Sequence, residues 1–215
     1  MNKDLKLNIG ITLWTLTSKE IRRFMRIWVQ TLVPPAVTMT LYFVIFGSLI
    51  GPRIGEMDGF DYVQFMIPGL IMMSVITGSY ANVVSSFYSV KFQKSIEELL
   101  ISPMPNWVIL CGFILGGVTR GILVGIIVFC VSLFFYPEFQ IVNIGLTITV
   151  LLLTSVLFSL MGFINAVFAD SFDDISVIPT FVLTPLIYLG GVFYSINILP
   201  DFWRSISMAN PMLYV

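Results

Sequence analysis

The 215-residue sequence has little charge. Charged residues make up 11% of the chain and hydrophobic residues 57%, whereas an ordinary soluble domain carries about 25% charge. One globule of this length cannot hide so much apolar surface from water, so a lipid bilayer is the solvent that fits the composition. The net charge of −1 gives no reason to expect nucleic acid as a partner. The composition therefore predicts an integral membrane protein.

Histidine is absent from the sequence. This absence excludes histidine-based metal sites, Ser–His pairs and the HExxH motif. The sequence also lacks a Gly-Lys-Ser/Thr phosphate loop, so the chain cannot bind ATP in the P-loop manner. We expect no catalytic residue, metal or cofactor on this chain, which is then not an enzyme. If ATP powers it, ATP and Mg²⁺ bind to another subunit.

Cysteine is scarce, with Cys111 and Cys130 in one apolar stretch. On a helix they would lie roughly 28 Å apart, which is too far for a disulfide. We therefore interpret both as packing residues.

Long apolar stretches are abundant. A spanning helix needs about 20 mostly apolar residues, and the charged residues fall almost entirely between such stretches. The sequence therefore predicts an all-α, polytopic membrane helix bundle. The chain also ends in an apolar run, which we interpret as the approach to a sixth span beyond the sequence; a short re-entrant element over 205–215 is the alternative. The predicted spans are 27–50, 63–90, 107–136, 141–169 and 175–199.

Lysine and arginine are distributed unevenly between the two sides of these spans. The opposite side has only Arg53 and Arg204, beside several acidic residues. Cytoplasmic loops carry an excess of basic residues, so we place the amino terminus in the cytoplasm. The basic residues on the predicted inner side are Lys3, Lys6, Lys19, Arg22, Arg23, Arg26, Lys91 and Lys94.

Residues 1–26 precede the first span and contain an amphipathic pattern. Apolar residues such as Ile9, Leu13 and Leu16 recur at helical spacing, with basic residues on the other faces. The pattern predicts a helix lying on the inner membrane surface; a simple topology anchor is the alternative. Thr17 and Glu20 match a capping box, so the helix could break near Thr17.

A second polar-side helix is predicted over 95–103. Ser95 and Glu98 match a capping box, and prolines at 103 and 105 prevent extension. A helix of about two turns is not stable by itself, so it must pack against something on the cytoplasmic side. The alternative is a turn lying on the lipid surface.

Arg120 is the only charged residue well inside a predicted span. Its guanidinium must face protein or water, because a charge facing lipid is costly. Asp170, Asp173 and Asp174 are possible partners. The sequence leaves open whether Arg120 is a pathway or gating charge or part of a structural ion pair.

The third span also carries a stripe of small residues. Its glycines include GxxxG spacings, which permit close approach of two helices. The stripe predicts helix packing within one subunit, and a dimer interface is the alternative. The glycines are Gly112, Gly116, Gly117, Gly121 and Gly125.

Two segments resemble a known family. Ser-Ile-Glu-Glu-Leu-Leu-Ile-Ser-Pro at 95–103 resembles the cytoplasmic segment of ABC-2 type transporter permeases. The stretch 179–194, followed by Leu-Pro at 199–200 and Asn-Pro at 210–211, resembles the carboxyl-terminal signature of that family. The resemblance implies a six-span permease of the bacterial inner membrane, an exporter, acting as a homodimer with two copies of a separate ABC ATPase subunit.

The resemblance also implies residue roles. Residues 1–26 would form the connecting helix, 27–215 the transmembrane domain and 95–103 the coupling helix that docks on the ATPase. Ser95 stands where threonine is commoner in the family, and Lys94 where glycine is commoner. The implied ATPase contacts are Ser95, Glu97, Glu98, Leu99, Leu100 and Pro103, with Glu20, Arg22 and Arg23 from the connecting helix.

Two other classes of function remain open at this point. One is an ion-coupled secondary transporter or channel that uses Arg120 and the acids of 170–174 as coupling charges. Such carriers often contain internal repeats, and none is evident here. The other is a membrane scaffold or assembly factor without transport activity.

Overall fold

The computed structural model describes residues 8–139 and 141–215. Lys3 and Lys6, counted above on the inner side, lie outside the described residues. The elements, in chain order, are α1 (Ile9–Arg26), α2 (Trp28–Thr31), α3 (Val33–Tyr42), the π-helical η1 (Phe43–Ile50), α4 (Gly51–Ile54), β1 (Glu56–Met57), β2 (Phe60–Asp61), α5 (Tyr62–Phe92), α6 (Ile96–Ile101), α7 (Asn106–Phe135), α8 (Ile144–Phe168), α9 (Asp174–Ile178), the π-helical η2 (Pro179–Leu183), α10 (Thr184–Tyr188), the 3₁₀ turn η3 (Ile196–Ile198), α11 (Asp201–Ala209) and the 3₁₀ turn η4 (Pro211–Tyr214).

Four helical stretches in the described residues are long and apolar enough to cross a membrane. The first, Trp28–Ile54, is composite and runs through α2, α3, η1 and α4; the other three are α5, α7 and α8. These stretches coincide with the first four predicted spans to within a few residues. The prediction of an all-α, polytopic membrane bundle is confirmed.

The helix predicted over 175–199 is shorter than expected. Its helical part is Asp174–Tyr188, roughly 22 Å long, against about 30 Å for a bilayer core. Beyond Tyr188 the chain turns, with Gly191 at a φ of +80°, and Phe193 packs on Phe46 with ring centroids 4.9 Å apart. Phe193 thus packs against the first span, and Val192 packs against Gly69 of α5. Apolar composition does not distinguish such a turn from a continuing helix.

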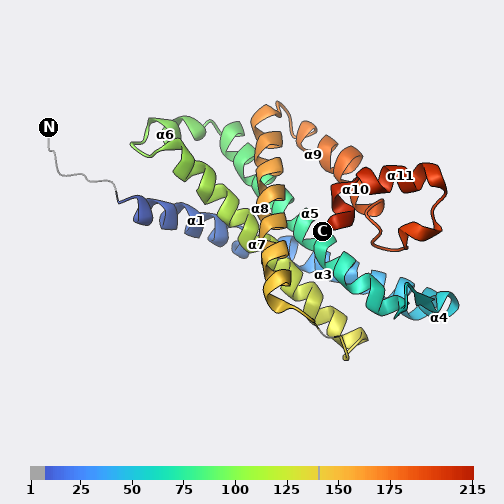
Figure 1. Ribbon diagram of the computed structural model, residues 1–215. Helices are drawn as coiled ribbons and strands as arrows, with labels where there is room; N and C mark the ends of the chain where they lie inside the picture. The colour runs from blue at the N-terminus through green and yellow to red at the C-terminus, as the bar shows by residue number, and fades with distance from the viewer. Residues whose placement is uncertain (1–7, 140) are drawn as a thin grey trace, which may run out of the picture.

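Helix α5 is the centre of the bundle and packs against both α7 and α8, which also contact each other (Figure 1). In its most apolar window 61% of the residues are buried, compared with 22% for α8. The exposed sides of α8 are apolar, as expected for a helix that faces lipid. The core therefore lies around α5.

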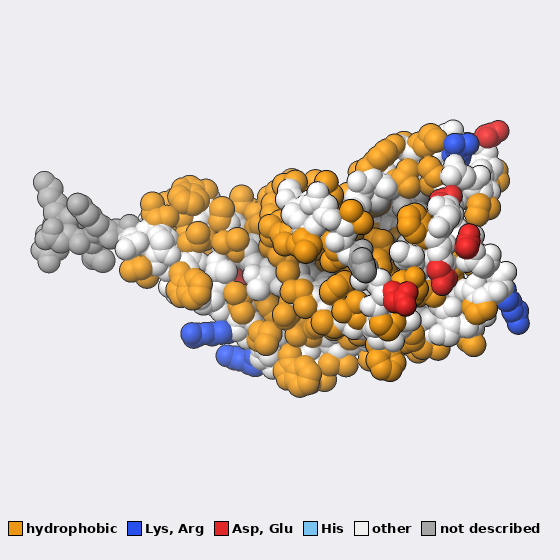
Figure 2. Space-filling model, turned by 60° about the horizontal axis from the view of Figure 1, so that its bottom comes forward, with side chains coloured by type: hydrophobic (Ala, Val, Ile, Leu, Met, Phe, Trp, Pro, Cys, Tyr) orange, Lys and Arg blue, Asp and Glu red, His pale blue; other side chains and the backbone are white. Residues whose placement is uncertain are grey.

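The charges gather at the two ends of the molecule. Figure 2 shows an apolar surface between basic side chains at one end and mostly acidic side chains at the other. Figure 1 places α1 and α6 at one end and the β1–β2 hairpin next to α4 at the other. The basic end is the one that the charge bias assigns to the cytoplasm.

Candidate functional site

The helix α6 forms the turn between α5 and α7. It covers Ile96–Ile101, six residues, so it is shorter than the predicted 95–103. Before it, Lys94 has a φ of +59°, and after it Ser102 is extended and leads into Pro103. The predicted capping box is not formed, because the Ser95 hydroxyl donates to the Val90 carbonyl oxygen at 3.2 Å.

The two sides of α6 differ. Ile96 and Leu99 pack against the hydrophobic core, while Glu97 and Glu98 are exposed. Leu100 is 58% exposed, and Ile101 is 84% exposed. Helix α6 therefore presents two carboxylates and two large apolar side chains together on the cytoplasmic side.

An apolar groove of about 510 Å³ lies beside α6. Ile96 and Leu100 form one wall, and the other walls come from the inner ends of α5, α7 and α8. Phe87, Trp107 and Phe163 are among the lining residues. The groove extends the exposed apolar surface of α6 toward the bundle.

Helix α1 is continuous from Ile9 to Arg26, with Asn8 as its N-cap. The predicted break near Thr17 is therefore wrong. Thr17 is buried within the helix, and the Glu20 carboxylate accepts from Ser86 of α5 instead of forming a capping box with Thr17. Helix α1 also packs lengthwise on the first part of α7 rather than lying only on the membrane surface (Figure 1). It is part of the bundle.

The glycines of α7 allow this packing. A Cβ atom on Gly112 would clash with the Leu16 side chain, and one on Gly116 would lie 2.6 Å from the Glu20 Cβ. Gly117, Gly121 and Gly125 face α5 in the same way, against the side chains of Val83, Ser79 and Val75. The stripe is occupied by helices of this same chain, as expected for packing within a subunit.

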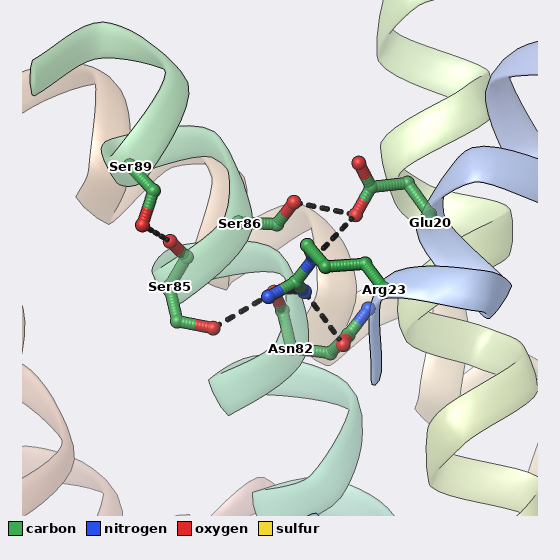
Figure 3. A network of polar contacts seen from close by, with 6 residues as sticks. All are labelled: Glu20, Arg23, Asn82, Ser85, Ser86 and Ser89. Atoms are coloured by element: carbon green, nitrogen blue, oxygen red, sulfur yellow. Dashed lines mark hydrogen bonds and ion pairs between the residues drawn. The ribbon is translucent and has the colours of Figure 1, made fainter. Parts of the chain in front are cut away.

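A polar network joins α1 to α5 (Figure 3). The Ser86 hydroxyl donates to the Glu20 carboxylate, and Arg23 Nε donates to the same oxygen at 3.2 Å. Arg23 Nη2 also donates to the Asn82 carbonyl oxygen at 3.1 Å and to Asn82 Oδ1 at 2.9 Å. The network connects the end of α1 with the turns of α5 that lead to α6.

This geometry corrects part of the expected ATPase interface. Glu20 is 1% exposed, so its carboxylate is not available to a partner. The Arg23 side chain is 32% exposed, but its guanidinium is engaged inside the subunit. Of the three α1 residues, only Arg22 is freely exposed.

Asn82 and Ser86 are the functional residues that the sequence analysis missed. The signal was present: polar residues recur at 82, 85, 86 and 89, which is helical spacing on the inner end of an apolar helix. A buried polar stripe requires hydrogen-bond partners. Which helix supplies them is decided only by the fold.

Arg120 is not brought together with the acids of 170–174. Its Nη2 donates to the Thr31 carbonyl oxygen at 3.3 Å. Asp174 instead accepts from the backbone N–H groups of Asp170 at 3.0 Å and Ser171 at 2.9 Å. These hydrogen bonds lower the pKa of the Asp174 carboxyl. An ion pair between Arg120 and these acids, one of the two alternatives left open above, is therefore absent from the described residues, and these residues do not form the charge cluster that the ion-coupled alternative invoked.

Lys91, counted above only as a topology signal, also has a local role. Its Nζ donates to the carbonyl oxygens of Val167 at 2.8 Å and Ala169 at 2.7 Å. These carbonyls belong to the C-terminal end of α8, where a cation is favourable. Lys91 thus ties α5 to α8 on the cytoplasmic side.

Several membrane-length helices joined by a short helix with exposed carboxylates are the arrangement of a transporter membrane subunit. The family model "ABC-2 type transporter" matches residues 12–215, so the chain belongs to the ABC-2 type transporter family. It is a transmembrane permease of the ABC transporter class, located in the inner membrane with several spans.

Two relatives illustrate the range of this family. The inner membrane transport permease YadH of Escherichia coli K12 is 62% identical over 205 residues, which cover 95% of this chain and 80% of that protein. Nodulation protein J of Rhizobium meliloti is 24% identical over 176 residues, which cover 81% of this chain and 66% of that protein. No solved structure matches the chain.

Proposed function

We propose that this chain is the membrane subunit of an exporter and that α6 receives force from a separate ABC ATPase. In this assembly two copies of the chain form a homodimer with two ATPase subunits, which bind ATP and Mg²⁺. Residues 1–26 act as the connecting helix and 27–215 as the transmembrane part. The observation that supports this proposal is the exposure of Glu97, Glu98, Leu100 and Ile101 on α6, at the end of the molecule that the charge bias assigns to the cytoplasm.

The surface chemistry of α6 suits a soluble protein partner better than lipid. Exposed Glu97 and Glu98 would repel the anionic inner leaflet, while Leu100 and Ile101 are left in contact with water. A partner with a cleft that is apolar inside and basic at its rim would cover both kinds of side chain. Docking would also stabilise a helix that is too short to be stable by itself.

The position of α6 would let it pass force to the bundle. It connects the central helix α5 directly to α7, and its core-facing residues Ile96 and Leu99 pack on the bundle. The network of Glu20 and Arg23 then joins the inner end of α5 to α1. A displacement of α6 would therefore move α1, α5 and α7 together as a largely rigid unit.

Charge reversal at α6 tests this proposal. We expect Glu97→Lys with Glu98→Lys to reduce the ATPase that co-purifies with the permease by about tenfold, since like charges across an interface cost several kcal/mol. ATP-dependent transport should fall with it, while the permease itself stays folded.

The matched control places the same charge change on the other side of the membrane. Glu56 and Glu138 are both exposed there, and their replacement by lysine should leave co-purification unchanged. Normal assembly and normal ATP-coupled transport in the α6 variant would refute the proposal. Transport that follows an ion gradient and ignores ATP depletion would instead indicate a secondary transporter.

A further inference from the structure

Arg120 lies in the middle of α7, but its contact is with the start of the first span. Its guanidinium contacts the carbonyl of Thr31. Thr31 follows Arg26, the last basic residue before the first span, by roughly 8 Å of helix. Arg120 is therefore little more than one helical turn below the plane marked by Arg26. An arginine side chain can reach the headgroup region from that depth.

The length of α7 leads to the same depth. Its 30 residues extend about 45 Å, which exceeds a hydrocarbon core of about 30 Å. From Arg120 to the outer end at Phe135 the helix measures roughly 22 Å. The first part of α7, on which α1 packs, therefore projects beyond the inner surface and brings Arg120 near that surface.

The surroundings of Arg120 contain more positive charge than negative charge. Within residues 8–139 and 141–215 the only ion pair is Glu20 with Arg23, so the nearby carboxylate is already engaged. Arg23 directly precedes Phe24, whose carbonyl oxygen accepts from the hydroxyl of Thr31, the residue that Arg120 contacts. A partly buried guanidinium without a counter-charge is costly, so the site needs an anion.

The hydrogen-bond donors at this position are also incompletely used. Arg120 Nε is buried and has no acceptor among the described residues, and the same holds for Asn82 Nδ2 on the facing helix. Buried donors normally have partners. A guanidinium presents its N–H groups in a planar fork that matches phosphate oxygens.

We propose that Arg120 binds the phosphate of an anionic phospholipid in the inner leaflet. The headgroup would lie where α1 ends and α2 begins, at the interruption of the helix at Ile27. Exposed Trp28 and Val29 lie next to this point and would contact the upper acyl chains, as tryptophan does at membrane interfaces. The lipid would fasten α1 to the first span.

Lipid retention tests this proposal without the ATPase, so its outcome is independent of the proposed function. The full chain is reconstituted with equal amounts of phosphatidylglycerol and phosphatidylcholine, and the lipids retained in detergent are counted by native mass spectrometry. A phosphate-binding arginine near the surface contributes about 1 kcal/mol, so we expect a preference of about fivefold or more for phosphatidylglycerol. Equal retention by the wild-type protein would overturn the proposal.

Three substitutions locate the site. Arg120→Gln should abolish the preference and Arg120→Lys should keep part of it, since lysine retains the charge but not the fork. Arg53→Gln, on the outer side, should behave as the wild type. An equal loss in Arg22→Gln, on the exposed side of α1, would indicate diffuse surface attraction and would contradict the assignment to Arg120.

A competition experiment separates a lipid headgroup from soluble phosphate. With inorganic phosphate in large excess, retained phosphatidylglycerol should persist, because its acyl chains also hold it to the protein. Displacement of the lipid by inorganic phosphate would assign the site to a soluble anion and overturn the lipid assignment. If Arg120→Gln fails to fold, the wild-type preference and this competition still decide the outcome.

Discussion

Helices α1 and α6 lie at the same end of the molecule (Figure 1), but they are held in different ways. Helix α1 packs along glycines of α7 and is joined to α5 by a buried carboxylate. Helix α6 is fixed mainly by its two flanking turns and by Ile96 and Leu99. The acidic side chains show the contrast: Glu20 is 1% exposed, whereas Glu97 and Glu98 point into solvent.

This difference shows which of the two helices can serve a partner. Charged residues on a short cytoplasmic helix predict an exposed contact surface in both cases. In α1, Glu20 and Arg23 form contacts inside the subunit. In α6, the carboxylates of Glu97 and Glu98 remain exposed and could contact a partner. Substitutions in α1 should therefore change the stability of the subunit, and substitutions in α6 should change its assembly with a partner.

The largest effect is expected for Gly116→Leu. A side chain at this position would force α1 away from α7, because even a Cβ atom would lie 2.6 Å from that of Glu20. We expect the free energy of unfolding to fall by about 3 kcal/mol or more, measured by thermal unfolding in detergent. Gly145→Leu is the matched control, since Gly145 is exposed; equal stability of the two variants would contradict the packing described here.

A smaller effect is expected for Glu20→Ala. The substitution leaves the Arg23 guanidinium and the Ser86 hydroxyl without their shared acceptor, at a cost of about 2 to 3 kcal/mol. Its counterpart Glu97→Ala should change stability by less than about 0.5 kcal/mol, as is usual for surface positions. If thermal unfolding gave the same shift for both variants, the distinction between α1 and α6 would fail.

Asn82→Ala tests the same contact between α1 and α5 by changing the residue on α5. It removes the Oδ1 acceptor of Arg23 but leaves the backbone carbonyl acceptor in place. The expected loss is therefore about 1 kcal/mol. A double-mutant cycle with Arg23→Ala measures the coupling between the two residues, and zero coupling energy would show that the contact does not stabilise α1.

The smallest effect concerns the exposed start of α9. The pKa of Asp174 is lowered by the N–H groups of Asp170 and Ser171, so its stabilising contribution is present above the ordinary carboxyl pKa of about 4. That contribution is lost as the pH falls through the lower pKa of the folded state. The protection factor of the Ser171 amide, which compares its exchange rate with that of an unstructured peptide at the same pH, should fall in acid, and Asp174→Asn should remove this pH dependence. A protection factor that stays constant with pH would contradict this local role.

The spans could be predicted because the bilayer requires long apolar stretches. The first four were located from composition alone. The prediction of the fifth span was wrong beyond Tyr188, because the chain turns there and Val192 and Phe193 pack on α5 and the first span. An apolar composition predicts that a segment is shielded from water, but it does not predict whether lipid or another helix shields it.

The cytoplasmic elements were predicted to be helices, but their partners were not. The segments 9–26 and 96–101 carry local signals: an apolar periodicity in the first, and a capping residue and bounding prolines in the second. Burial of Glu20 depends on Ser86 and Asn82, which lie far away in the chain. Local patterns cannot show that these residues meet.

The sequence alone determined that this protein is a helical membrane bundle, because hydrophobic length acts locally along the chain, and its charge bias predicts an inner amino terminus. The tertiary structure alone decided that α1 packs along α7, that the acidic side of α6 stays exposed and that Arg120 contacts Thr31. The packing of α1 depends on how closely two backbones approach at glycine positions. Such an approach is a property of helices packed together and is not encoded in either helix by itself.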